Sequence, residues 1–253
     1  MNSTHLGSFL LSGFLGLTAL SMSACSPRSG HIRFQHPGLK DHSGTSHTTA
    51  PGVGGHWFKK NQPTHSPAAY QLRNRVTASA TSAVGKRQVH VQGKAYRRDC
   101  SGVVRGIYAH AGLPLGGAPI TPNENDVSII YRWVQENGSI RKSHPLPGDL
   151  VFFDDTYDRN GDQRENDPLS HIGIVEEILS DGTVVFVHHV AGGILRYRMN
   201  LRNPKTTTEE STGKRRNHIL RRANKDIDSA TTAELFVGYG TIILDGEARF
   251  AYR

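Results

Sequence analysis

The chain has 253 residues, a formal net charge of +8 and a pI near 9.7. This length accommodates one ordinary domain with extra segments rather than two full domains. Hydrophobic residues make up 36% of the chain, so a sizeable part of it lies outside a packed core. The positive charge favours anionic surroundings. No aromatic-rich basic stripe accompanies it, which argues against nucleic-acid binding.

The amino terminus has the pattern of an export signal. Residues 6–22 are apolar and small, and too short and rich in Gly and Ser for a membrane-spanning helix. They lead into MSAC at 22–25, which resembles the lipobox that directs lipid attachment to a bacterial cysteine. The first five residues lack Lys and Arg, so an ordinary cleaved secretory peptide is the alternative. We expect residues 1–24 to be a signal peptide and Cys25 to carry a lipid anchor, which places the exported protein on a membrane facing the periplasm or cell wall.

The next segment, residues 25–65, is rich in Ser, Gly, Pro, Thr and His and has no apolar period. Such a composition cannot bury enough surface to offset ordering entropy, so we expect a disordered tether. Metal binding by its histidines is the less favoured alternative because their spacing is irregular. Residues 66–253 are then the folded domain.

Apolar periodicity and capping residues predict three helices early in this domain. The first is closed by Gly85, a common residue after a helix end. The second begins at Cys100, and Asn137-Gly138 closes the third. The expected helices span 68–84, 100–111 and 126–136.

Strands follow the helices. A Pro-Gly-Asp turn precedes a short apolar run, and Ser180-Asp181-Gly182 separates two runs that form an expected hairpin. Helices followed by antiparallel strands predict an α+β domain. The expected strands are 150–153, 171–179, 183–190 and 194–199, with 218–221 or 235–243 as a closing element.

The sharpest motif is Asp99-Cys100-Ser101-Gly102. Asp99 is a natural N-cap, which places Cys100 in the first helical turn. Unpaired amides and the helix dipole there stabilise a thiolate, so we expect a lowered thiol pKa. The same amides can donate to an oxyanion. The competing interpretation is a small buried core cysteine.

Two further features favour catalysis. A thiolate nucleophile needs an imidazole to take and return its proton, and that ring needs an orienting polar group. His171 opens an apolar strand after a polar loop. His188 and His189 lie on the next strand and point to opposite faces, so only one can serve. Spacing alone leaves the choice between them open.

The ordered motifs DCSG, PGDLVFF, HIGIVEEI and FVHH resemble those of the NlpC-type family of papain-like cell-wall cysteine peptidases. The resemblance covers about residues 68–200. It implies a papain-like core with Cys100 as nucleophile, His171 as base and His188 as orienting residue. It further implies that Asp99 holds the free amine of a peptide stem, with Ser101 and Tyr96 in the same site.

The insertion before His171 contains a possible ion-binding pattern. Asp158, Asn160 and Asp162 repeat at the one-three-five spacing of calcium loops. Gln163 replaces the glycine of such loops, and Leu169 stands in place of the bidentate glutamate. We therefore favour a charged surface loop, with calcium as the alternative, and expect that no cofactor is required.

The resemblance implies hydrolysis of amide bonds in peptidoglycan stem peptides through a thioester, by a monomer held near its substrate by a lipid. One alternative is a CHAP-type amidase on a similar scaffold. Another is a wall-binding lipoprotein without activity, and a third is an acyltransferase that uses the same thioester.

Overall fold

The structure is a computed structural model, and it describes residues 66–119, 121, 122 and 124–244. The expected signal peptide, the whole of the expected tether and the lipidation site Cys25 lie outside the described residues. Within the described part, no helix is both long enough and apolar enough to cross a bilayer.

The three predicted helices are confirmed to within two residues at each end. They are α1 (Pro67–Ala83), α2 (Cys100–His110) and α3 (Asp126–Asn137). Side chains of the expected type cap α2 and α3, where Asp99 accepts from the amide of Gly102 and Asn125 from that of Ser128. Capping of this kind satisfies amides that have no partner inside the helix.

A six-stranded antiparallel sheet forms the second layer, in the order β3-β10-β4-β5-β6-β7. The four strands predicted between 150 and 199 are confirmed, and β3 is a strand that was not predicted. Two short ladders, β1–β2 and β8–β9, lie outside this sheet. The strands of the sheet are β3 (Ser139–Arg141), β4 (Leu150–Phe153), β5 (His171–Ile178), β6 (Val184–Val190), β7 (Gly193–Met199) and β10 (Phe236–Thr241). The short ladders are β1 (His90–Val91) with β2 (Lys94–Ala95), and β8 (Ile219–Arg221) with β9 (Ala230–Thr231).

The last strand has an unexpected place. A closing element at 235–243 was predicted, but β10 lies inside the sheet between β3 and β4, and β8 at 219–221 belongs to a separate ladder. Glycine at position 240 lets β10 pack in this place, because a Cβ there would lie 2.8 Å from the Phe152 ring and 3.0 Å from Val134 on α3. The strand therefore fits closely beneath a helix.

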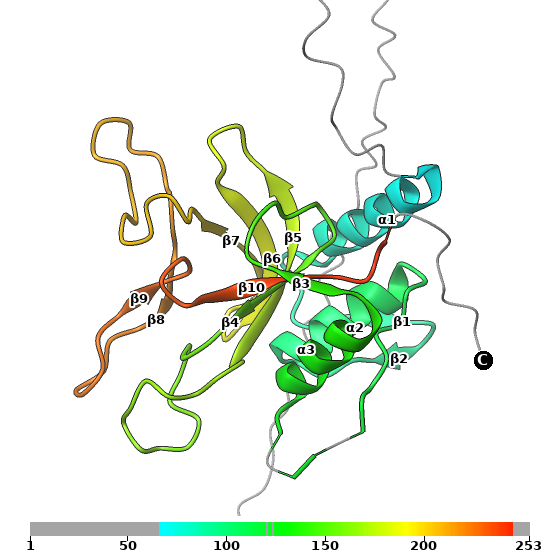
Figure 1. Ribbon diagram of the computed structural model, residues 1–253, viewed down its shortest axis with the longest axis horizontal. Coiled ribbons are helices and arrows are strands. Elements are labelled where there is room, and N and C mark those ends of the chain that lie inside the picture. The colour runs from blue at the N-terminus through cyan, green and yellow to red at the C-terminus, as the bar shows by residue number, and fades with distance from the viewer. Residues whose placement is uncertain (1–65, 120, 123, 245–253) are drawn as a thin grey trace, which may run out of the picture. The chain divides into compact units, whose positions relative to one another are not determined.

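Hydrophobic cores lie on both faces of the sheet. The three helices cover one face, with Ile107, Ile130 and Ile174 among the buried residues there. The other face packs Phe153 and Phe186 against the segment that leads into β10. Figure 1 shows the helices on one side of the sheet and the β8–β9 ladder on the other. This is the predicted α+β arrangement of helices on a small antiparallel sheet.

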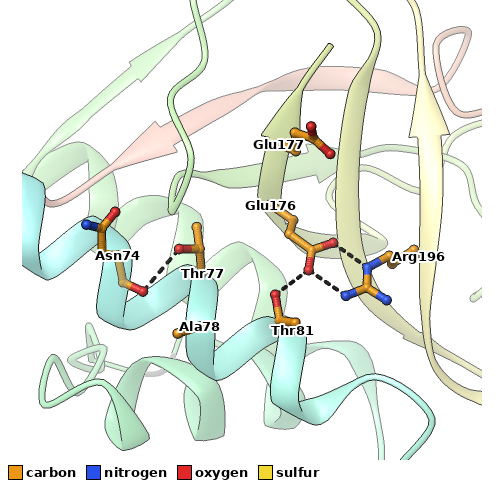
Figure 2. Close-up of a pocket in the computed structure, with 7 residues that line it drawn as sticks. All are labelled: Asn74, Thr77, Ala78, Thr81, Glu176, Glu177 and Arg196. Carbon is orange, nitrogen blue, oxygen red and sulfur yellow. Dashed lines mark hydrogen bonds and ion pairs between the residues drawn. The ribbon is translucent and has the colours of Figure 1, made fainter. Parts of the chain in front are cut away.

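Polar contacts join α1 to the sheet at two points. Figure 2 shows Glu176 of β5 between Thr81 of α1 and Arg196 of β7, which donates to it with both Nε and Nη2. Deeper in the domain, Arg73 of α1 pairs with the fully buried Asp149 at 2.8 Å. These contacts fix the helical layer against the strands that hold the site.

Candidate active site

Cys100 is the first residue of α2, directly after its cap Asp99. The Asp99 carboxylate accepts from the Gly102 amide at 2.7 Å and from the Ser101 hydroxyl at 2.9 Å. A Cβ at Gly102 would lie 2.4 Å from the Arg97 carbonyl oxygen, so this turn requires glycine. The Asp-Cys-Ser-Gly sequence thus positions the sulfur at a tight entry into the helix.

The sulfur of Cys100 lies against the start of β5. The backbone amides of Ile172, Ser101 and Cys100 itself lie near the sulfur and favour its thiolate form. Ile172 directly follows His171, so the sulfur lies beside the start of the strand that carries the predicted base. Three amides directed at one sulfur are the donors that a thiolate or a neighbouring oxyanion needs.

His171 and His188 form a buried pair on the face of the sheet opposite the helices. Nε2 of His171 and Nδ1 of His188 lie 2.8 Å apart, and the two rings are nearly perpendicular. His188 is fully buried and packs against Tyr197, with ring centroids 4.2 Å apart. His189 is half-buried and, by strand alternation, points to the other face. The ring that lies beside His171 is therefore that of His188 and not that of His189.

Burial decides the protonation of this cluster. It raises the pKa of Cys100 to about 11, and the negative charge of Asp99 adds to the rise although the amides oppose it. It lowers the pKa of His171 to about 4 and holds that of His188 well below its usual value. Both the thiol and the imidazoles are consequently neutral at pH 7. The lowered thiol pKa expected from the helix start is wrong for the free protein, because desolvation outweighs the amides.

Neutral rings restrict the tautomers that are useful for catalysis. If His171 accepts the thiol proton at Nδ1, its Nε2 must carry hydrogen and donate to Nδ1 of His188. His188 then carries its own hydrogen on Nε2, which is buried without a hydrogen-bond partner among the described residues. The pair therefore places an unpaired polar atom behind the base.

An open cleft of about 380 Å³ leads to the sulfur. Its walls come from the turn before α2, the start of α3 and the loop between β4 and β5. Arg97 bridges the carboxylates of Asp99 and Asp126, at 2.7 and 2.5 Å. The residues that line the cleft are Arg97, Asp99, Cys100, Ser101, Glu124, Asn125, Asp126, Val127, Tyr157 and Ser170.

A protein-family model described as the NlpC/P60 family matches residues 85–217. The match covers more than half of the chain and includes Cys100, His171 and His188. The chain belongs to the NlpC/P60 family. Members of this family are typically cell-wall cysteine peptidases or amidases with a papain-like α+β fold, and the sheet and helices described above have that fold. No curated protein and no solved structure matches the chain.

The structure brings three of the residues singled out in the sequence together at the cleft. Asp99 and Ser101 line the cleft beside Cys100. Tyr96 instead lies against Gly106 in the middle of α2, and the described residues that line the cleft do not include it. Seven of the ten lining residues were not predicted as site residues, and Asp126 and Tyr157 are among them. Asp126 was recognised only as the start of a helix, and no signal marked Tyr157 within its polar loop.

The loop between β4 and β5 is tied together across its base. The Asp154 carboxylate accepts from the Leu169 amide at 2.6 Å, and the hydroxyls of Thr156 and Ser170 lie 2.9 Å apart. These contacts fix the chain immediately before His171. They also hold Tyr157 at the mouth of the cleft.

The candidate calcium ligands lie at the tip of this loop. Asp158 accepts from the amides of Gly161 and Gln163, at 2.7 and 2.9 Å. Asn160 and Asp162 similarly accept from amides two residues ahead. Among the described residues, no three His, Cys, Asp or Glu side chains are grouped so that they could hold a metal ion. Calcium binding here stays the less favoured alternative to a charged surface loop.

Proposed function

We propose that the protein is a cysteine peptidase that hydrolyses amide bonds in peptidoglycan stem peptides through a thioester. The observation that carries this proposal is the placing of Cys100 at a helix start, against the amide next to His171, at the end of an open cleft. The hydrogen bond between His171 and His188 supports it. A core cysteine retained only for packing would need neither the histidine pair nor the cleft.

The proposed reaction starts from the neutral pair. His171 takes the proton of Cys100, and the thiolate attacks the carbonyl carbon of the scissile amide. Backbone amides around the sulfur donate to the oxyanion that forms. The intermediate collapses as His171 gives its proton to the leaving amine, which leaves a thioester. Water then attacks the thioester while His171 takes a proton from it, and release of the new carboxyl group restores the thiol.

The acidic wall of the cleft supports a stem peptide with a free amine as substrate. Asp99, Asp126 and Glu124 line this wall, and Arg97 balances part of their charge. A protonated amine that pairs with Asp99 would bring the following amide bond toward the sulfur. We assign Ser101 to the same subsite. Tyr96 is assigned to it only on the family resemblance.

We further propose that the protein is exported as a monomer and held at a membrane by a lipid on Cys25. The export signal at 1–24 and the polar tether at 25–65 support this location. An anchor would keep the enzyme beside the wall, and the tether would give it reach.

The test is digestion of purified peptidoglycan by the mature protein beside its Cys100→Ala variant, with mass spectrometry of the released fragments. We expect stem fragments from the wild type alone, with masses that identify the bond. Release of whole stems from the glycan would instead support the amidase alternative. If neither protein releases fragments while both bind the wall, the proposed function is wrong and a binding lipoprotein takes its place.

A further inference from the structure

A second pocket lies away from the cleft, on the outer strands β6 and β7. It encloses about 440 Å³ and is lined by Val185, Arg196, Arg198, Arg215 and His218. None of these residues lines the Cys100 cleft. Four of the five carry a cationic or titratable side chain, so the pocket is strongly basic.

The pocket is built on the edge of β7. The backbone of Arg198 donates to Nδ1 of His218 at 2.9 Å and accepts from the His218 amide at 3.1 Å. In the neutral ring the hydrogen of His218 is therefore on Nε2, where it can be donated to a ligand. The ring stacks on Tyr197 with centroids 4.4 Å apart.

The chain segment that supplies Arg215 and His218 is firmly held. The fully buried Asn217 lies between them, and its amide group donates to the carbonyls of Asn203 and Thr206, each at 2.8 Å. Its side-chain oxygen accepts from the Asn200 amide at 2.6 Å. The two sides of the pocket are thus fixed relative to each other, which lowers the entropic cost of binding a ligand.

The cations around this pocket fall into two groups. Arg196 is neutralised by Glu176, as Figure 2 shows, and Arg216 by Asp181. Arg198 and Arg215 have no carboxylate partner among the described residues. The guanidinium of Arg198 makes only a 3.5 Å contact to the Arg215 carbonyl oxygen. Two arginines without a carboxylate partner among the described residues consequently line the same pocket as His218.

The charge of the whole chain points to the same region. Residues 196–225 contain ten Lys or Arg and two Asp or Glu, while the rest of the chain contains twenty of each. The net charge of +8 is therefore carried by this one segment. Basic residues that look scattered along the sequence are concentrated around β7 and the chain after it.

We propose that this pocket is a binding site for a phosphate group. Two guanidinium forks and an imidazole N–H present donors from three directions, which matches the several oxygens of a tetrahedral phosphate better than the two of a carboxylate. Arg198 and Arg215 contact the anion through their guanidinium groups, and His218 donates from Nε2. The site is separate from the Cys100 chemistry and does not depend on it.

The pKa of His218 reports directly whether phosphate occupies the pocket. Burial lowers the pKa of His218, and the positive charges of Arg215 and Arg198 lower it further. An anion that neutralises these two arginines favours the imidazolium form, so phosphate binding raises this pKa.

The experiment is titration of the full chain carrying Cys100→Ala with inorganic phosphate, followed by calorimetry and by NMR of the His218 ring. We expect saturable binding and a rise in the His218 pKa. The double variant Arg198→Ala/Arg215→Ala should bind phosphate at least about tenfold more weakly. The matched double variant Arg202→Ala/Arg222→Ala removes the same charge from exposed positions of the segment outside the pocket. It should change binding by less than about twofold.

Equal weakening by the two double variants would show a diffuse charge effect and overturn the proposal. So would binding that does not saturate, or a His218 pKa that phosphate leaves unchanged. The source of the phosphate is then found by competition. Displacement of inorganic phosphate by soluble poly(glycerol phosphate) identifies a polymer, and displacement by phosphatidylglycerol vesicles identifies a lipid headgroup. A failure of peptidoglycan digestion leaves these results unaffected, because the titrated protein lacks the nucleophile.

Discussion

Two buried polar clusters in this domain differ in whether their groups are charged or neutral. Beside α1, the Asp149 carboxylate accepts hydrogen bonds from Arg73, Arg141 and the Leu146 amide. These donors occupy both of its oxygens. At the candidate active site, burial holds the Cys100 thiol at the cleft and the imidazoles of His171 and His188 in neutral form, and Nε2 of His188 has no partner among the described residues.

The difference separates a structural role from a chemical one. A buried charge surrounded by donors on all sides holds elements together and does not readily change its protonation state. A buried group in neutral form beside a cleft can exchange a proton when a substrate arrives. We therefore expect changes in the first cluster to lower stability, and changes in the second to lower activity.

The largest effect should follow from His171→Ala. Loss of the base should lower kcat/KM on a stem-peptide substrate by about 10³- to 10⁴-fold. The cavity and the lost hydrogen bond to His188 should also lower Tm, but the protein that stays folded should still lack activity. His189→Ala is the matched control on the adjacent position, and it should retain activity to within about threefold. Similar losses in both variants would contradict the assignment of His171.

Asp149→Ala tests the cluster of Asp149 with Arg73 and Arg141. It leaves the buried charge of Arg73 without its partner, which should lower the free energy of unfolding by about 3–5 kcal/mol in urea titration. The activity of the molecules that remain folded should stay near that of the wild type. Arg141→Ala keeps the pair of Arg73 with Asp149, so it should cost clearly less, and equal losses would argue against a central role of that pair.

The histidine pair also predicts an acid limit to stability. An unfolded chain protonates His171 near pH 6.5, whereas the folded chain holds its pKa at about 4. The unfolded state therefore binds more protons between these values, and stability falls as pH drops through this window. The loss from this residue should total about 3 kcal/mol. Urea titrations at several pH values should show a shallower slope for His171→Ala, and an unchanged slope would refute the shifted pKa.

The thiol should react as a neutral group in the free protein. With a Cys100 pKa of about 11, its alkylation by iodoacetamide should rise about tenfold per pH unit and thus about 100-fold from pH 7 to 9. Mass spectrometry of the modified peptide measures this rate. A rate that is already maximal at pH 6 would show a preformed ion pair with His171 instead.

Much of this arrangement could be predicted because its signals are local. Asp99 as a cap places Cys100 at a helix start, and period-two patterns locate the strands that hold His171 and His188. The place of β10 could not be predicted, because strand order depends on contacts far apart in the sequence. The pKa of Cys100 was wrongly predicted for the same reason, since the burial that raises it comes from packing against β5.

The smallest effect concerns Tyr157, which packing rather than pattern brings to the cleft. Its side chain is 51% exposed and it lies at the cleft mouth, near the sulfur but outside the proton-transfer pair. Tyr157→Ala should raise KM for stem peptides about three- to tenfold and leave kcat within about twofold, because only contact area with bound substrate is lost. Tyr157→Phe keeps the ring and should behave like the wild type. Tyr70→Ala removes a comparably exposed ring from α1 and should change neither constant, so a fall in kcat for Tyr157→Ala alone would assign the tyrosine to the chemistry instead.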